Sequence, residues 1–186
     1  AGSPESYRRQ LDLDTAVATT TFTIDGTSYT REVLASPVDQ VIAVRLTADK
    51  PGSISVNVAL DRPADFEVAP VGNDTLSMFG QTSHEGKHKG VRYHTQVQAR
   101  LEGGSIEVED KTLSIDKANA VTLLLAAATD YNFDDPYKPL ERDLAQACAE
   151  QLAAARVKAY DRIRNDHVGE HRRLFRRVDL DLGTTP

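Results

Sequence analysis

The run AVTLLLAAAT at residues 120–129 is the most apolar stretch of this 186-residue chain, and no charged residue interrupts it. It is too short to cross a bilayer, which takes about 20 apolar residues. Its periodicity alone fits a buried strand and a buried helix equally well. The flanks favour a strand, because turn-forming residues precede it at 116–119 and follow it at 130–136. We therefore expect residues 120–129 to form a strand that is covered on both faces, in the middle of a sheet.

The residues before this run divide into short, partly alternating segments joined by turn sequences. The alternation of apolar and polar residues is clearest at 53–60. Asp25-Gly26 separates two such segments and predicts a hairpin with a type I′ turn. Strands are expected at 16–24, 27–34, 38–47, 53–60, 75–79, 91–101, 105–109 and 112–115, and loops at 61–74 and 81–90. Strands joined by short turns without interleaved helices indicate a mainly β, antiparallel sandwich or barrel.

The pattern changes after Pro139. Apolar residues then recur at helical spacing on a background rich in Ala, Gln, Glu and Arg. The alternating segment 178–183 could add a last strand. We expect an antiparallel β-sandwich domain over 1–137 and a helical tail over 138–186.

Composition excludes several classes of protein. The net charge of −6 and the absence of an obvious basic face in the first 140 residues argue against nucleic acid as a partner. Cys148 is the single cysteine, which excludes an internal disulfide framework and a multi-cysteine metal site. No stretch reads as a signal peptide or a membrane-spanning helix, an absence that says little for a chain that looks cut at both ends. No membrane partner is expected. The chain starts AGSP and ends GTTP, and we expect it to be a piece of a longer protein.

A possible metal motif lies near the end of the chain. HVGEH at 167–171 matches the His-x-x-Glu-His pattern of inverted zinc peptidases. A zinc site needs a third protein ligand, however, and little chain remains to supply one. The alternative is that His167 packs near a helix junction and His171 is solvated. We predict no metal and no cofactor, and we expect the arginines within 172–177 to pair with an acidic partner domain.

Two loops carry candidate binding residues, because loops at the rim of a β scaffold often bind ligands. His84 and His88 lie in the expected loop 81–90. Tyr131 and Asn132 follow the central strand in a stretch rich in groups that suit a sugar. The alternatives are a solvated loop for the first pair and a capping loop for the second. No catalytic residue is predicted.

Several motifs, taken in order, resemble a known family. They are YRRQLDLDTA at 7–16, DG at 25–26, YTRE at 29–32, SPVDQV at 36–41, LLLAAAT at 123–129, DH at 166–167, LFRRV at 174–178 and LDLG at 180–183. In this order they are similar to the amino-terminal domain of glycoside hydrolase family 95, the inverting α-L-fucosidases. The resemblance covers nearly the whole chain.

The resemblance implies a part of a β-supersandwich, followed by a helical linker toward an (α/α)₆ catalytic barrel that lies outside this sequence. The parent enzyme would hydrolyse terminal α-L-fucosides, or related α-L-galactosides, with inversion. In that reaction one carboxylic acid protonates the leaving oxygen while a base activates water on the opposite face. The family's acid, base and assisting Asn residues lie in the barrel, so none maps onto this chain, which is expected to be inactive alone.

The resemblance also implies partners and a location. The partners would be the barrel of the parent enzyme and its fucosylated glycan substrate, and the parent would be secreted or periplasmic. The first strands of the sandwich would be missing, and the exposed sheet edges would favour a homodimer. The main alternative is a stand-alone carbohydrate-binding or interaction module. The absence of Trp and an aromatic content of 6% argue against it, because they leave no obvious stacking platform.

Overall fold

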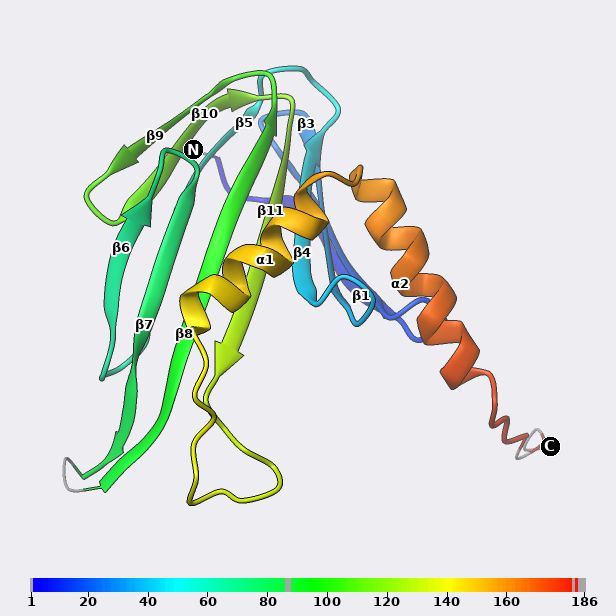
Figure 1. The fold of residues 1–186 in the computed structure, drawn as a ribbon. Helices are drawn as coiled ribbons and strands as arrows, with labels where there is room; N and C mark the ends of the chain where they lie inside the picture. Colours follow the sequence, from blue (N-terminus) through cyan, green and yellow to red (C-terminus); the bar gives the residue numbers. More distant parts are fainter. Residues whose placement is uncertain (1, 86–87, 182, 184–186) are drawn as a thin grey trace.

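The computed structural model describes residues 2–85, 88–181 and 183 (Figure 1). Its strands form two antiparallel sheets, and two helices follow them. The large sheet has the order β1-β2-β3-β4-β11-β8-β7-β6, and the small sheet has the order β5-β10-β9. The strands are β1 (Glu5–Asp12), β2 (Val17–Ile24), β3 (Thr27–Ser36), β4 (Val41–Ala48), β5 (Ile54–Ala59), β6 (Glu67–Val71), β7 (Thr75–His84), β8 (His88–Glu102), β9 (Ser105–Glu109), β10 (Thr112–Ala118) and β11 (Ala120–Thr129). The helices are α1 (Leu144–Arg156) and α2 (Tyr160–Phe175). The expected mainly β, antiparallel fold is confirmed.

Strand β11 occupies the middle of the large sheet, as its apolar sequence predicts. It pairs with β4 on one side and with β8 on the other. Side chains on its two faces belong to two different hydrophobic cores. Leu124 and Ala126 pack against the helices, whereas Val121 packs against the small sheet. A strand with both faces covered has no solvent side, which explains why its sequence shows no alternation.

The large sheet is therefore the central layer of the molecule. On its inner face the small sheet packs against β11, β8 and part of β4, with Leu76, Leu113 and Val121 fully buried between them. On its outer face α1 crosses β8 and β11, and α2 lies beside β3 (Figure 1). Each fully buried Leu contributes about 2 kcal/mol of transfer free energy to this packing.

The hairpin predicted at Asp25-Gly26 is confirmed. Both residues have positive φ, 49° for Asp25 and 68° for Gly26, as a type I′ turn between β2 and β3 requires. Glycine reaches this conformation without the steric penalty of a Cβ atom. The turn fixes the register in which Phe22 lies opposite Tyr29.

The loop expected at 61–74 is partly wrong, because β6 lies within it. Pro70 suppresses a strand prediction, since proline has no N–H to donate to a ladder. In the structure Pro70 lies opposite Leu76 of β7, and β6 is the outermost strand on that side of the large sheet. An edge strand accommodates proline because one of its sides needs no hydrogen-bond partner.

Three other segments of the chain differ from the secondary structure expected from the sequence. The loop expected at 81–90 is wrong, because β7 runs to His84 and β8 begins at His88. Strand β1 was not predicted, because all its side chains are exposed and no alternation marks a buried face. The strand expected at 178–183 does not form in 178–181 or at 183, and Leu182 lies outside the described residues.

Both helices bury one side on the large sheet. Asp143 caps α1 by accepting a hydrogen bond from the backbone N–H of Gln146 at 3.0 Å, and the helix buries Cys148 and Leu152. Helix α2 buries Ile163 and His167. Within the described residues, neither helix is long and apolar enough to cross a membrane.

Candidate functional site

The two histidines of the possible zinc motif fasten α2 to the turn between β1 and β2. The Nε2 atom of His167 lies 3.0 Å from the carbonyl oxygen of Thr15, and that of His171 lies 2.8 Å from the carbonyl oxygen of Leu13. These contacts use the Nε2 atom of each ring and place both histidines against the main chain of the turn. His167 is 4% exposed and packs as the alternative reading expects. His171 is not simply solvated, because it stacks between His167 and Phe175.

The basic residues after this motif also find a partner inside the chain. Arg172 and Arg176 both pair with Asp14, at 2.7 Å each. The hydrogen bond from Arg176, with further help from Arg172, lowers the pKa of Asp14 to about 2. These contacts bind the end of α2 to the β1–β2 turn. The expected pairing of these arginines with an acidic partner domain stays a prediction.

Tyr131 and Asn132 lie in a protruding loop, residues 130–143, which we call the 130–143 loop (Figure 1). The amide of Asn132 braces the loop from within: its Nδ2 donates to the carbonyl of Lys138 at 2.9 Å, and its Oδ1 accepts from the N–H of Asp134 at 3.0 Å. Tyr131 packs edge-to-face on Phe133, with the ring centroids 4.9 Å apart. Asn132 therefore shapes the loop, while the aromatic rings form its surface.

The base of the 130–143 loop is held firmly. Asp130 is 3% exposed, and its carboxylate accepts from both the backbone N–H and the Nε of Arg92 at 2.8 Å. Leu140 closes the loop by donating its N–H to the carbonyl of Asp130 at 2.8 Å. Beyond this base, Phe133 and Tyr137 are 90% and 95% exposed. These two rings were not predicted as binding residues, although their position beside prolines and aspartates is a signal for exposed loop aromatics.

His84 and His88 lie opposite each other in the β7–β8 hairpin. Their side chains lie outside the part of the chain that the structure describes, so their expected binding role stays a prediction. The antiparallel pairing of β8 with β11 brings the start of β8 to the end of the large sheet where β11 ends. The hairpin and the 130–143 loop therefore project from the same end of the sheet (Figure 1).

A histidine–serine pair, half-buried at His94 and buried at Ser77, lies under α1 and resembles half of a nucleophilic site. The Nε2 atom of His94 is 2.6 Å from the Oγ atom of Ser77. Ser77 is only 3% exposed, so a substrate does not reach its oxygen. The main-chain carbonyl of His94 accepts from the Cys148 thiol, and the ring stacks on Phe79. Burial lowers the pKa of His94, against a smaller opposing effect of the Asp143 charge. The pair therefore serves packing.

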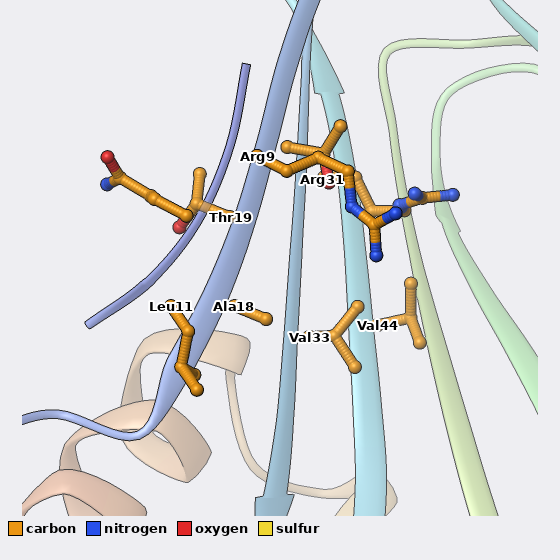
Figure 2. A pocket seen from close by; sticks show the side chains of 9 residues that line it. Arg9, Leu11, Ala18, Thr19, Arg31, Val33 and Val44 are labelled. Atoms are coloured by element: carbon orange, nitrogen blue, oxygen red, sulfur yellow. The ribbon is translucent and has the colours of Figure 1, made fainter. Parts of the chain in front are cut away.

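The inner face of the large sheet is only partly covered. The small sheet leaves β1–β3 open, and a groove of about 530 Å³ lies over them (Figure 2). We call it the inner-face groove, lined by Arg9, Leu11, Thr20, Arg31, Val33 and Val44. A second groove of about 690 Å³ adjoins it at Arg31 and Val44 and has β5 as one wall. Neither groove was predicted from the sequence, because the width of the large sheet and the part of it that the small sheet covers depend on contacts between residues far apart in the chain.

Comparison with known proteins gives a matching family and a solved structure with a similar fold. The model of the family described as "Glycosyl hydrolase family 65, N-terminal domain" matches residues 1–134. A solved structure assigned as a kojibiose phosphorylase from the human microbiome matches with a TM-score of 0.61 and 14% identity, over 91% of this chain and 25% of that one. At this identity the second match supports the fold alone.

Curated relatives are fucosidases. The chain is 33% identical to alpha-L-fucosidase 2 of Arabidopsis thaliana over 200 residues, or 95% of this chain and 24% of the relative. It is 26% identical to "Probable alpha-fucosidase A" of Aspergillus oryzae, over 96% of this chain and 26% of the relative. The chain thus spans about a quarter of the length of these relatives. The resemblance to amino-terminal domains of fucosidase-like glycoside hydrolases is confirmed, and the chain belongs to the glycosyl hydrolase family 65 N-terminal domain family.

Proposed function

We propose that this chain is the non-catalytic amino-terminal scaffold of a glycoside hydrolase of the α-L-fucosidase kind, in family 95. The observation that carries the proposal is the extent of the match to alpha-L-fucosidase 2, which takes in 95% of this chain but 24% of that enzyme. The packing of α1 and α2 on the outer face suits a scaffold, because it gives the chain after the sheet a fixed direction. Residues 1–137 would act as the sandwich domain and 138–186 as the linker.

The reaction of the longer enzyme would be hydrolysis of a terminal α-L-fucoside, or of the related galactoside, with inversion. A carboxylic acid and a carboxylate base on opposite sides of the sugar would carry it. Both would belong to a catalytic (α/α)₆ barrel and none to this chain. As a secreted or periplasmic enzyme, the parent would meet fucosylated glycans outside the cytoplasm.

The 130–143 loop is the best candidate for a contact with substrate. Its base is fixed by Asp130 and Arg92, and it projects Phe133 and Tyr137 away from the sheet. Exposed rings on a rigid loop bind a flat apolar surface at small entropic cost, and one face of a sugar ring is such a surface. Tyr131 and the hairpin histidines at 84 and 88 would lie at the same end and wall the sugar cleft.

The test compares the 186-residue chain with the longer enzyme, using an aryl α-L-fucoside. We expect turnover by the longer enzyme and none by the chain. Turnover by the purified chain alone would refute the scaffold role.

The second candidate function, a stand-alone carbohydrate-binding module, is favoured by the same two exposed rings. Titration of the chain with fucosylated oligosaccharides separates the two functions. Millimolar or tighter binding that is lost in the double variant Phe133→Ala/Tyr137→Ala, and kept in the control Val157→Ala, would favour the module. Val157 suits as a control because it is 85% exposed but lies after α1, outside the loop.

A further inference from the structure

A shallow pocket lies on the outer face of the large sheet, at the point where α1 begins. Its floor is formed by Phe79 and Gln81 of β7 and by Arg92 and His94 of β8, and its wall is formed by residues 142–145. We call it the outer-face pocket. Its volume of about 380 Å³ lies within the range of small-molecule sites, about 300–1,000 Å³. In Figure 1 the start of α1 lies at β8, where the 130–143 loop ends.

The floor of the pocket is a block of four side chains that the strand register sets. Phe79 lies opposite His94, and Gln81 lies opposite Arg92. Opposite residues point to the same face of a sheet, as do residues two apart on one strand, so the four side chains share the outer face. Two positions before Phe79 this face is buried, at Ser77, whereas none of the four residues is buried. The block is therefore accessible to a ligand.

The floor offers a fixed apolar surface. The rings of Phe79 and His94 lie nearly parallel, with an interplanar angle of 9° and centroids 5.6 Å apart. His94 is held in turn by Ser77, whose hydroxyl oxygen lies 2.6 Å from the Nε2 atom. An aromatic ring that is already held in place can contact the C–H face of a sugar ring at small entropic cost.

Polar groups beside this surface are also fixed by contacts within the chain. Gln81 donates a hydrogen bond from Nε2 to the carbonyl of Gly90 at 2.9 Å. Arg142 donates from Nε and Nη2 to the carbonyl of Thr129, at 3.1 and 2.7 Å. Among the described residues, the Oε1 of Gln81 and the Nη1 of Arg142 have no hydrogen-bond partner. One acceptor and one donor of known position are thus available to a ligand.

The charged groups around the pocket are balanced. Arg92 and Arg142 bring two positive charges, and Asp143 in the wall brings a negative one. Asp130 supplies the second carboxylate, which binds the Nε of Arg92 at 2.8 Å. A site that offers donors and acceptors without a net charge favours a neutral ligand with several hydroxyl groups, because an anion meets the two carboxylates and a cation meets the two guanidinium groups.

We propose that the outer-face pocket binds one neutral sugar ring of a glycan. The ring places its C–H face on Phe79, and its hydroxyl groups bond to Gln81, Arg142 and Asp143 at the rim. This inference rests on the proposed function for the class of ligand alone. It assigns a place for a sugar on this chain and requires no turnover.

A small oxyanion is the main alternative occupant, because two arginines and the first N–H groups of α1 lie close together. It fits less well for two reasons. The Asp143 carboxylate already caps this helix end by accepting from the N–H of Gln146. An oxyanion would also leave the aromatic floor without an apolar contact.

The test is a titration of the isotope-labelled 186-residue chain, followed by the chemical shifts of its amides. The ligands are two neutral glycosides, methyl α-L-fucoside and methyl β-D-galactoside, with D-glucuronate and inorganic phosphate as charged probes. We expect a neutral glycoside to bind with a millimolar dissociation constant and to shift the amides of Gln81, Arg92 and Ala145. The charged probes should bind about tenfold more weakly, or less.

Two variants locate the site. Ala145→Trp fills the pocket from its wall and should weaken glycoside binding about tenfold or more. Ala149→Trp is the matched control, because it places the same side chain one turn further along α1, at an exposed position outside the pocket, and should leave binding unchanged. Phe79→Ala removes the stacking surface and should weaken binding about fivefold. Circular dichroism verifies that each variant is folded.

Several outcomes would overturn the proposal. They are the absence of glycoside binding well above millimolar concentration, equal binding by the chain and a folded Ala145→Trp variant, and tighter binding of phosphate than of either glycoside. Binding that survives Ala145→Trp and is lost in Phe133→Ala/Tyr137→Ala would place the sugar on the 130–143 loop instead. None of these results bears on turnover by the longer enzyme, so the pocket and the proposed function are tested separately.

Discussion

At the scale of single residues, Asp14 shows how a side chain on a turn stabilises a distant helix. It lies between β1 and β2, yet Arg172 and Arg176 of the α2 end converge on it. Helix α2 thus gains an ion-pair network at its last turn, where basic residues also interact favourably with the helix dipole. The sequence alone does not show that Asp14 and Arg172 are in contact, because they are 158 positions apart in the chain.

The pH dependence of this contact follows from the sign of the shift. The pKa of Asp14 falls from its ordinary value of 3.8 to about 2 in the folded chain. A lowered folded-state pKa stabilises the fold at every pH above the unfolded value and stops doing so as the pH falls through about 2. Asp14→Asn should therefore lower the urea midpoint at pH 7 and have little effect at pH 2. An equal loss at both pH values would contradict this account.

His167 makes a second prediction at this scale. It is 4% exposed and binds the carbonyl of Thr15, so its loss removes packing and leaves a buried carbonyl without its donor. We expect His167→Ala to cost about 2–3 kcal/mol of unfolding free energy. His171→Ala, which removes a more accessible ring from the same helix, should cost about 0.5–1 kcal/mol. Chemical denaturation of both variants measures the two losses of unfolding free energy. A larger loss for His171→Ala than for His167→Ala would show that His167 is not the main contact between α2 and the turn.

At the scale of elements, β11 shows what a sequence can specify by itself. Its ten residues, eight of them apolar, are flanked by turn residues, so both its type and its bounds follow from the local sequence. Strands β6 and β1 depend on tertiary context instead. Pro70 is tolerated only because β6 lies at an edge, and β1 shows no alternation because no layer covers either of its faces. The local sequence pattern predicts an element well where the element is buried in the core, and poorly where it lies at the edge of a sheet.

The same reasoning explains which parts of the candidate sites could be predicted. The loop position of Tyr131 and Asn132 could be predicted because loop chemistry is local, whereas their binding role stays a prediction. The placement of Arg9 and Arg31 on the two sides of Thr20 in the inner-face groove was not predicted, because it depends on the register of three strands. The uncovered face above them depends on the width of a sheet formed by residues far along the chain.

Strand β11 also gives a prediction at this scale. Leu124 is fully buried against the helices in the middle of the strand. Leu124→Ala should cost about 3–4 kcal/mol, because rigid neighbours on both sides cannot close the cavity. Ile42→Ala is the control: it removes a large side chain from the neighbouring strand β4, where it is 41% exposed, and should cost about 1 kcal/mol. Thermal or urea unfolding measures both, and similar losses would mean that β11 does not organise the core.

At the scale of the whole molecule, the helices and the large sheet share one core. Residues of β2, β3, β4 and β11 pack with residues of both helices in a single cluster. The segment between the helices is tied to the sheet as well. Lys158 binds Asp39, beside β3, at 2.6 Å and Asp166 of α2 at 3.2 Å, and these contacts raise the pKa of Lys158. Removing the helices would expose the apolar outer face of β11 to water.

This arrangement predicts that the helices and the sheet unfold as one unit, although the sequence divides them into a sandwich and a tail. A cooperative unit is defined by shared buried contacts, and the outer core belongs to both parts. Native-state hydrogen exchange should therefore give the amides of β11 and those in the middle of α1 opening free energies that agree within about 1 kcal/mol. His167→Ala should lower both by similar amounts, because α2 belongs to the same core. If α1 opened several kcal/mol below β11, the helices would be an independent tail, and the outer core would owe its stability to the sheet alone.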